Sequence, residues 1–217
     1  MITEEEARAL EAPCTKEEIF QVLKGFKKEK SLGPDGWTVE LYLHFFELMG
    51  QDLLEAIEDS RISCFVNKQL NSTFIVLIPK QNHPRHFSDY RSILLCNLSY
   101  KIITKIIANI IFPLLSWALV EEQFGFLKGR QILDAIGTAQ ECLHNIKTKN
   151  LPIILLKLDL KQAFDCINWN FLHLILLQCG FGAATTNCMM GCITTATLEV
   201  LINGEASKSF HSERGLR

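Results

Sequence analysis

Residues 157–165, Lys-Leu-Asp-Leu-Lys-Gln-Ala-Phe-Asp, directly follow the apolar run Leu151-Pro-Ile-Ile-Leu-Leu156. The run predicts a buried strand, and the residues after it predict the start of a helix. Asp159 would then lie at the carboxyl edge of a sheet, where α/β folds place their ligands. A carboxylate there can hold Mg²⁺, a hard cation that prefers oxygen ligands and bridges to substrate phosphates. The stretch therefore predicts half of a two-metal phosphoryl-transfer site, with Phe164 close enough to wall the pocket.

The composition of the chain is that of an ordinary globular protein. Its 217 residues are 48% hydrophobic and 21% charged, enough to fill the core of one large domain or two small ones. The formal net charge is −2. Dedicated nucleic-acid binders are usually basic, so the bulk charge gives no signal for such a partner, and only local clusters of lysine and arginine remain as candidates.

The cysteines and the apolar stretches point to an intracellular chain without a membrane partner. The eight cysteines contain no Cys-x-x-Cys pair, which favours buried thiols in a reducing compartment over zinc or disulfides. The acidic N-terminus does not have the pattern of a signal peptide, so we expect the cytoplasm or the nucleus. The apolar stretch 106–119 is shorter than the ~20 residues that a bilayer needs, and we expect a buried helix that stops at Pro113.

The first half of the chain predicts helices followed by a strand. Thr15-Lys-Glu-Glu18 is a capping box at the start of a helix. A second helix is expected from Thr38 to near Gly50, and a third after it. Residues 73–78, Thr-Phe-Ile-Val-Leu-Ile, are rich in β-branched side chains and predict a strand. The polar residues 81–90 predict a loop.

The second half predicts four more helices and a hairpin. The helices are expected at 99–111, at about 169–179, as a short helix after the break at Gly180–Gly182, and over a segment whose apolar side chains face inward (Ile132, Ile136, Ala139, Leu143 and Ile146). Asp165 is expected to cap or orient the turn into the helix at Trp169, rather than to bind a metal. Asn203-Gly204 predicts a type I′ hairpin turn with a returning strand near 207–211. Mixed helices and strands predict an α+β fold.

Seven motifs in a fixed order resemble the reverse transcriptase domain of non-LTR (LINE-type) retrotransposons, particularly those of plants. Each motif alone is weak, but the ordered series is specific, and the resemblance runs from about residue 15 to the last residue. The motifs are Lys30-Ser-Leu-Gly-Pro-Asp-Gly36, Leu70-Asn-Ser-Thr-Phe-Ile-Val-Leu-Ile-Pro-Lys80, Phe87-Ser-Asp-Tyr-Arg-Ser-Ile-Leu-Leu-Cys-Asn97, Gln123-Phe-Gly-Phe-Leu-Lys-Gly-Arg130, Leu156-Lys-Leu-Asp-Leu-Lys-Gln-Ala-Phe-Asp165, Val200-Leu-Ile-Asn-Gly204 and Ser212-Glu-Arg-Gly-Leu-Arg217.

The resemblance implies the fingers and a partial palm of a right-hand polymerase, which copies RNA into DNA with two Mg²⁺ ions. It divides the chain into an acidic tail (1–14), a helical N-terminal extension of the fingers (15–72), the fingers (73–150) and the first part of the palm (151–217). The implied partners are an RNA template, a DNA primer and a deoxynucleoside triphosphate. The strand at Asp159 and the hairpin are expected to lack neighbours, so self-association through an open palm edge is expected too.

The resemblance also implies a role for individual residues. Asp159 would be the catalytic metal ligand, and the backbone carbonyl of Leu160 would add a second oxygen. Phe164 would lie beneath the incoming sugar and exclude a 2′-hydroxyl. Lys80 and Arg91 would bind the triphosphate, which agrees with the need of phosphoryl transfer for positioned positive charge. Lys128 and Arg130 precede a helix, where backbone N–H groups favour anions, and are expected to contact template phosphates.

One element of the family's active site does not occur in this sequence. The family carries a second metal-binding motif, Ala-Asp-Asp, and no Asp-Asp pair is present here. We therefore expect a fragment of an RNA-directed DNA polymerase that is inactive alone. The alternatives are a non-catalytic nucleic-acid-binding module and an inert pseudogene product.

Overall fold

The computed structural model describes residues 12–127, 129–160 and 163–216. The chain divides into two compact units: a first unit of Met1–Ala108 with Phe164–Arg217, and a second unit of Asn109–Ala163. Within the described parts, no helix is both long enough and apolar enough to span a membrane.

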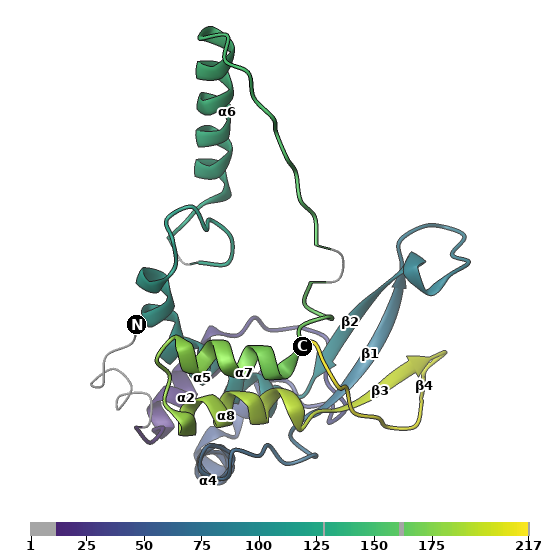
Figure 1. Cartoon of the computed structure of the whole chain (residues 1–217). Helices are drawn as coiled ribbons and strands as arrows, with labels where there is room; N and C mark the ends of the chain where they lie inside the picture. The colour runs from purple at the N-terminus through teal and green to yellow at the C-terminus, as the bar shows by residue number, and fades with distance from the viewer. Residues whose placement is uncertain (1–11, 128, 161–162, 217) are drawn as a thin grey trace. The chain divides into compact units, whose positions relative to one another are not determined.

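A four-stranded mixed sheet in the order β2-β1-β3-β4 lies in the first unit (Figure 1). β1 (Ser72–Pro79) pairs antiparallel with β2 (Tyr90–Cys96) and parallel with β3 (Thr197–Ile202). β1 covers the predicted strand, whereas β2 was not predicted. Because β3 pairs with β1, the segments expected to form fingers and palm contribute to one sheet. The hairpin that begins with β3, which we expected to lack a neighbouring strand, therefore has one in β1.

The hairpin turn has the conformation that its sequence predicts. Asn203 and Gly204 have φ values of +53° and +89°, as a type I′ turn requires. The returning strand β4 (Glu205–Ala206) is shorter and earlier than expected, and Phe210 adds one isolated bridge to Leu198.

Capping residues set the starts of the first two helices that the structure describes. α2 (Lys16–Gly25) begins at the predicted capping box, where Thr15 accepts a hydrogen bond from the Glu18 N–H, and the Glu18 carboxylate accepts one from the Thr15 N–H. Thr38 caps α3 (Val39–His44), and the single residue Phe45 separates it from α4 (Phe46–Ser63). The prediction that a helix stops near Gly50 is wrong, because Gly50 is buried inside α4 and glycine alone does not end a packed helix.

The core of the first unit forms around side chains from α2 and from α5 (Leu98–Ala118). Ile19, Leu23 and Ile102 are completely buried. α5 continues through Pro113, so the predicted stop there is wrong. Proline removes one backbone N–H from the helix but does not by itself forbid the following turn.

Two further helices complete the described part of the first unit. α7 (Trp169–Gln178) and α8 (Ala183–Thr194) pack against each other, and α8 also packs against α4 (Figure 1). Asn168 caps α7 by accepting hydrogen bonds from the N–H groups of Asn170 and Phe171. Asp165, which was expected to cap or orient this turn, is not the N-cap and lies in the turn three residues earlier.

The second unit departs from the sequence expectations in two ways. α6 (Ile132–Thr148) forms, but none of its residues is buried, so its apolar face does not point into a core as predicted. Residues 151–160 have no regular secondary structure and are exposed, with Ile154 95% accessible. The expected buried strand before Asp159 is thus absent: a strand needs a hydrogen-bonded neighbour, and no described strand pairs with this run.

Candidate functional site

The ends of β1 and β2 bring Lys80 and Arg91 together. Arg91 is directly opposite Ile78 in the antiparallel ladder, and the Lys80 N–H donates to the Asp89 carbonyl at 2.7 Å. Directly opposed residues of an antiparallel pair share a face, and positions two apart along a strand share it as well. Lys80 and Arg91 therefore lie on one face as diagonal neighbours. Both are exposed, which leaves this end of the hairpin open to a ligand.

A hydrogen-bonded turn shapes the loop between these two residues. The Asp89 carboxylate accepts the N–H groups of Arg85 at 2.8 Å and His86 at 3.0 Å, and η1 (Phe87–Asp89) follows. These two donors hold the pKa of Asp89 below its usual value. The Lys80 ammonium donates to the Ser88 carbonyl at 2.7 Å, so the loop also fixes the direction of the lysine.

Phe164 lies in a turn of the first unit, at the base of α7. Its ring is 56% exposed, and its carbonyl accepts a hydrogen bond from the Leu216 N–H at 2.8 Å. More than half of the residue thus faces solvent, while its backbone is held by residues near the end of the chain.

Asp159 and Leu160 lie in the second unit, on the exposed run 151–160. The carboxylate of Asp159 and the carbonyl of Leu160 belong to consecutive residues and are hard oxygen donors, as Mg²⁺ prefers. Among the described residues, no group of three or more His, Cys, Asp or Glu side chains is placed to hold a metal ion.

Of the two residues expected to contact the template, Arg130 has a defined position and Lys128 lies outside the described residues. The Arg130 guanidinium donates to the carbonyls of Val120, of Gln123 at 2.9 Å and of Leu119 at 3.2 Å. Arg130 thus closes the loop that precedes α6.

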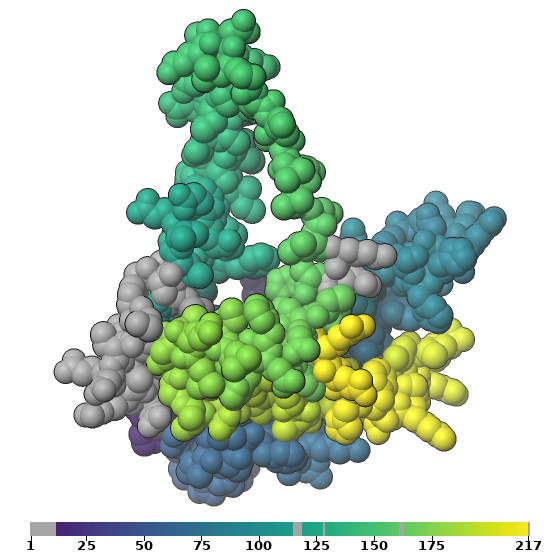
Figure 2. All heavy atoms as spheres, in the orientation of Figure 1, coloured from purple at the N-terminus to yellow at the C-terminus, as the bar shows by residue number. Residues whose placement is uncertain are grey.

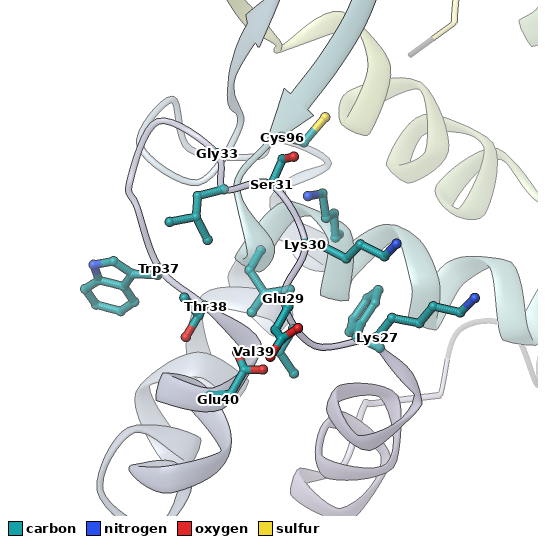
Figure 3. Close-up of a pocket in the computed structure, with 14 residues that line it drawn as sticks. Lys27, Glu29, Lys30, Ser31, Gly33, Trp37, Thr38, Val39, Glu40 and Cys96 are labelled. Carbon is teal, nitrogen blue, oxygen red and sulfur yellow. The ribbon is translucent and has the colours of Figure 1, made fainter.

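A pocket of about 450 Å³ in the first unit was not predicted. Figure 3 shows the amino groups of Lys27 and Lys30 extending to the same side, away from the indole of Trp37 and the carboxylates of Glu29 and Glu40. Lys101 on α5 completes the cationic lining. Burial raises the pKa of the nearby Asp35 carboxyl, against the effect of the Lys101 charge. The lysines make one end of the pocket positive.

The loop over this pocket is fixed by Asn97, a buried residue that sequence reasoning overlooked. Its side-chain oxygen accepts the Asp35 N–H at 3.1 Å, and its amide donates to the Gln69 carbonyl at 2.8 Å. Gly33 packs against the same residue: a Cβ there would lie 2.5 Å from the Asn97 N and Oδ1. The available signal was an asparagine between a strand and a helix, a position that favours side-chain bonds to backbone.

Comparison with known proteins now gives the family. The model of the reverse transcriptase (RNA-dependent DNA polymerase) family matches residues 78–217. The "Transposon TX1 uncharacterized 149 kDa protein" of Xenopus laevis is 25% identical over all 217 residues, which span 17% of that protein's length. The matched region contains Lys80, Arg91, Asp159 and Phe164. The resemblance to a retrotransposon reverse transcriptase domain is thereby confirmed, while the plant affinity stays a prediction. The chain belongs to the reverse transcriptase family.

Proposed function

We propose that the chain is the fingers and the first part of the palm of a retrotransposon RNA-directed DNA polymerase. The observation that carries the proposal is the placement of Lys80 and Arg91 on one exposed face of the β1–β2 hairpin, inside the region that matches the family. Reverse transcriptases in general bind template, primer and nucleotides and use divalent metal ions. This chain's own partners would be an RNA template, a DNA primer and a deoxynucleoside triphosphate, in the cytoplasm or the nucleus.

In this proposal the two cations neutralise the triphosphate, and Phe164 lies beneath its sugar. Phosphoryl transfer depends mainly on positioning and on neutralising oxygen charge, which a lysine and an arginine on adjacent strands can supply. The Ser88 carbonyl fixes the Lys80 ammonium in a definite direction. Lys128 and Arg130 would contact template phosphates near α6.

Asp159 and the Leu160 carbonyl would hold one Mg²⁺ in the complete site. Two-metal catalysis needs ligands that keep both ions about 4 Å apart. The sequence has no Asp-Asp pair, so Asp159 lacks the usual companion carboxylates. The purified chain should therefore bind a nucleotide but not extend a primer.

Two measurements test this function. We expect titration with a deoxynucleoside triphosphate in Mg²⁺ to give weak binding that falls at least tenfold in Lys80→Ala/Arg91→Ala. The charge-matched control Lys68→Ala/Lys208→Ala should bind as the parent does. Primer extension on an RNA template should give no product. Equal binding by the two double variants would refute the triphosphate site. Primer extension that depends on Asp159 would refute the proposal that the catalytic metal site is incomplete.

The pocket supports a second candidate function, that of a nucleic-acid-binding module without catalysis. Three lysines line it, and an exposed aromatic lies at its other end, a combination that suits phosphate and base contacts. We expect Lys27→Ala/Lys30→Ala to weaken binding of a single-stranded RNA and to reduce its salt dependence by one to two ion equivalents. Lys68→Ala/Lys208→Ala again serves as the control. If RNA binding had the same salt dependence in the two double variants, the pocket would not be the RNA-binding site.

A further inference from the structure

Hydrogen bonds tie the end of the chain to the segment that bears Phe164. We call residues 164–169 the gate segment and residues 214–216 the C-terminal strap. The N–H groups of Leu216 and Gly215 donate to the carbonyls of Phe164 and Ile167, each at 2.8 Å. In the other direction, the Trp169 indole N–H donates to the Gly215 carbonyl at 2.8 Å. Figure 2 shows the strap, in yellow, against the green atoms of the gate segment and α7.

Gly215 allows this close approach. Its φ is +89°, a conformation that L side chains rarely adopt, and a Cβ there would lie 2.8 Å from the Asp165 carbonyl oxygen. The residue is buried where the strap meets the gate segment. Both of its backbone polar groups are used, the N–H towards Ile167 and the carbonyl towards Trp169.

The Trp169 bond is the only one of these three that uses a side chain. An indole N–H can donate but not accept, so it selects a carbonyl partner, here one that is 46 positions away in sequence. Phe164 lies in a turn, outside any helix or strand, and the Leu216 N–H of the strap bonds to its carbonyl. Its ring remains exposed beside this ordered backbone.

We propose that Trp169 is a positioning residue for sugar discrimination, because it fixes the strap that fixes the backbone of Phe164. The inference rests on the proposed function, in which the Phe164 ring lies beneath the nucleotide sugar. Exclusion of one hydroxyl by an aromatic ring requires the ring to be held within a fraction of an ångström. Without the indole bond the strap loses its side-chain anchor to the gate segment, so the backbone of Phe164 is held less firmly and the ring should admit either sugar.

The test compares Trp169→Phe with His173→Phe in the whole chain. His173 also lies on α7, but its ring contacts Asn187 on α8 instead of the strap. dUTP and UTP in Mg²⁺ are the probes, since they differ only in the 2′-hydroxyl. Amide exchange at Gly215 and Leu216 reports on the strap. We expect Trp169→Phe to raise exchange at both amides about fivefold, as loss of one hydrogen bond predicts, and to bring the ratio of dUTP to UTP affinity close to one. His173→Phe should leave both quantities unchanged.

A second pair of variants separates positioning from general destabilisation. Gly204 has the same φ as Gly215, but a Cβ at Gly204 would have no neighbouring atom within 4 Å, so Gly204→Ala carries the backbone strain without the clash at Asp165. Gly215→Ala should lose sugar discrimination, and Gly204→Ala should keep it. Faster strap exchange with an unchanged affinity ratio would overturn the positioning role of Trp169. A parent chain that binds neither triphosphate would instead refute the proposed nucleotide site, and the discrimination with it, whatever the exchange shows.

Discussion

At the scale of the residue, Asn97 joins three segments that are distant in sequence. Its side chain bonds to Asp35 in the loop over the pocket and to Gln69 ahead of β1, and it stands itself between β2 and α5. A buried amide with both ends paired is favourable, whereas the same amide with one partner removed costs the desolvation of the group left behind. The geometry around this residue should therefore tolerate little change.

Gly33 gives a direct test of that tightness. Gly33→Ala would place a Cβ 2.5 Å from Asn97 atoms, so the loop or the asparagine must move, at a cost of about 1–3 kcal/mol in unfolding free energy. Gly25→Ala is the matched control, since nothing lies within 4 Å of its Cβ. Urea unfolding followed by fluorescence measures both, and equal midpoints would show that the loop is not clamped on Asn97.

Asp89 gives a pH dependence with a definite sign. Hydrogen bonds from the Arg85 and His86 N–H groups lower its pKa in the folded chain. The stability that the ionised Asp89 carboxylate gives to the folded loop is therefore complete above the ordinary carboxyl pKa of about 4. It is lost as the pH falls through the lower pKa that Asp89 has in the folded chain. Amide protection at Arg85 and His86 should decline below about pH 4 in the parent. In Asp89→Ala the protection of these two amides should be absent at every pH. If their protection in the parent did not change with pH, the stabilising role of the Asp89 carboxylate would be contradicted.

At the scale of the element, local chemistry decides where α2 starts. Removing the Thr15 hydroxyl in Thr15→Ala should cost about 1 kcal/mol of unfolding free energy, and Thr15→Ser, which keeps the acceptor, much less. Chemical unfolding monitored by circular dichroism would measure both. If Thr15→Ser were as destabilising as Thr15→Ala, the methyl group and not the cap would be responsible.

The elements that could be predicted from sequence are those with a local cause. The α2 cap, the Asn203-Gly204 turn and strand β1 depend on neighbouring residues, and each forms as expected. β2 was missed because its sequence, Tyr-Arg-Ser-Ile-Leu-Leu-Cys, acquires its strand structure by pairing with β1. The predictions that α6 would bury its apolar face and that run 151–160 would form a buried strand were wrong for the same reason. Burial depends on partners that the periodicity of a sequence does not reveal.

The candidate site shows the same division. The resemblance indicated Lys80 and Arg91, and the β1–β2 register places them on one face. Asn97, Trp169 and Gly215 were missed because their partners are distant in sequence, 62 positions for Asn97 and Asp35 and 46 for Trp169 and Gly215. A residue type alone does not show which remote carbonyl or N–H it will meet.

At the scale of the whole molecule, the apolar residues are distributed unequally between the two units. The first unit buries aliphatic side chains such as Leu23 of α2, Ile102 of α5 and Leu198 of β3, whereas the described part of the second exposes Ile154, Leu156 and most of α6. Exposed apolar runs of this kind mark surfaces that associate with other chains or with further sequence. We therefore expect the isolated chain to bind a hydrophobic dye such as ANS and to self-associate.

Ile154→Lys/Leu156→Lys tests whether the run 151–160 is the cause. Both side chains are largely exposed, so the substitution should change the unfolding free energy by no more than about 0.5 kcal/mol. Dye fluorescence and the apparent mass in sedimentation should nevertheless both fall. Leu48→Lys is the control, since Leu48 is also exposed but lies on α4 in the first unit, and it should leave both readings as they are. A parent chain that is monomeric, melts cooperatively and binds no dye would show that the run is covered in solution. The inference that the second unit has an open apolar surface would then be wrong.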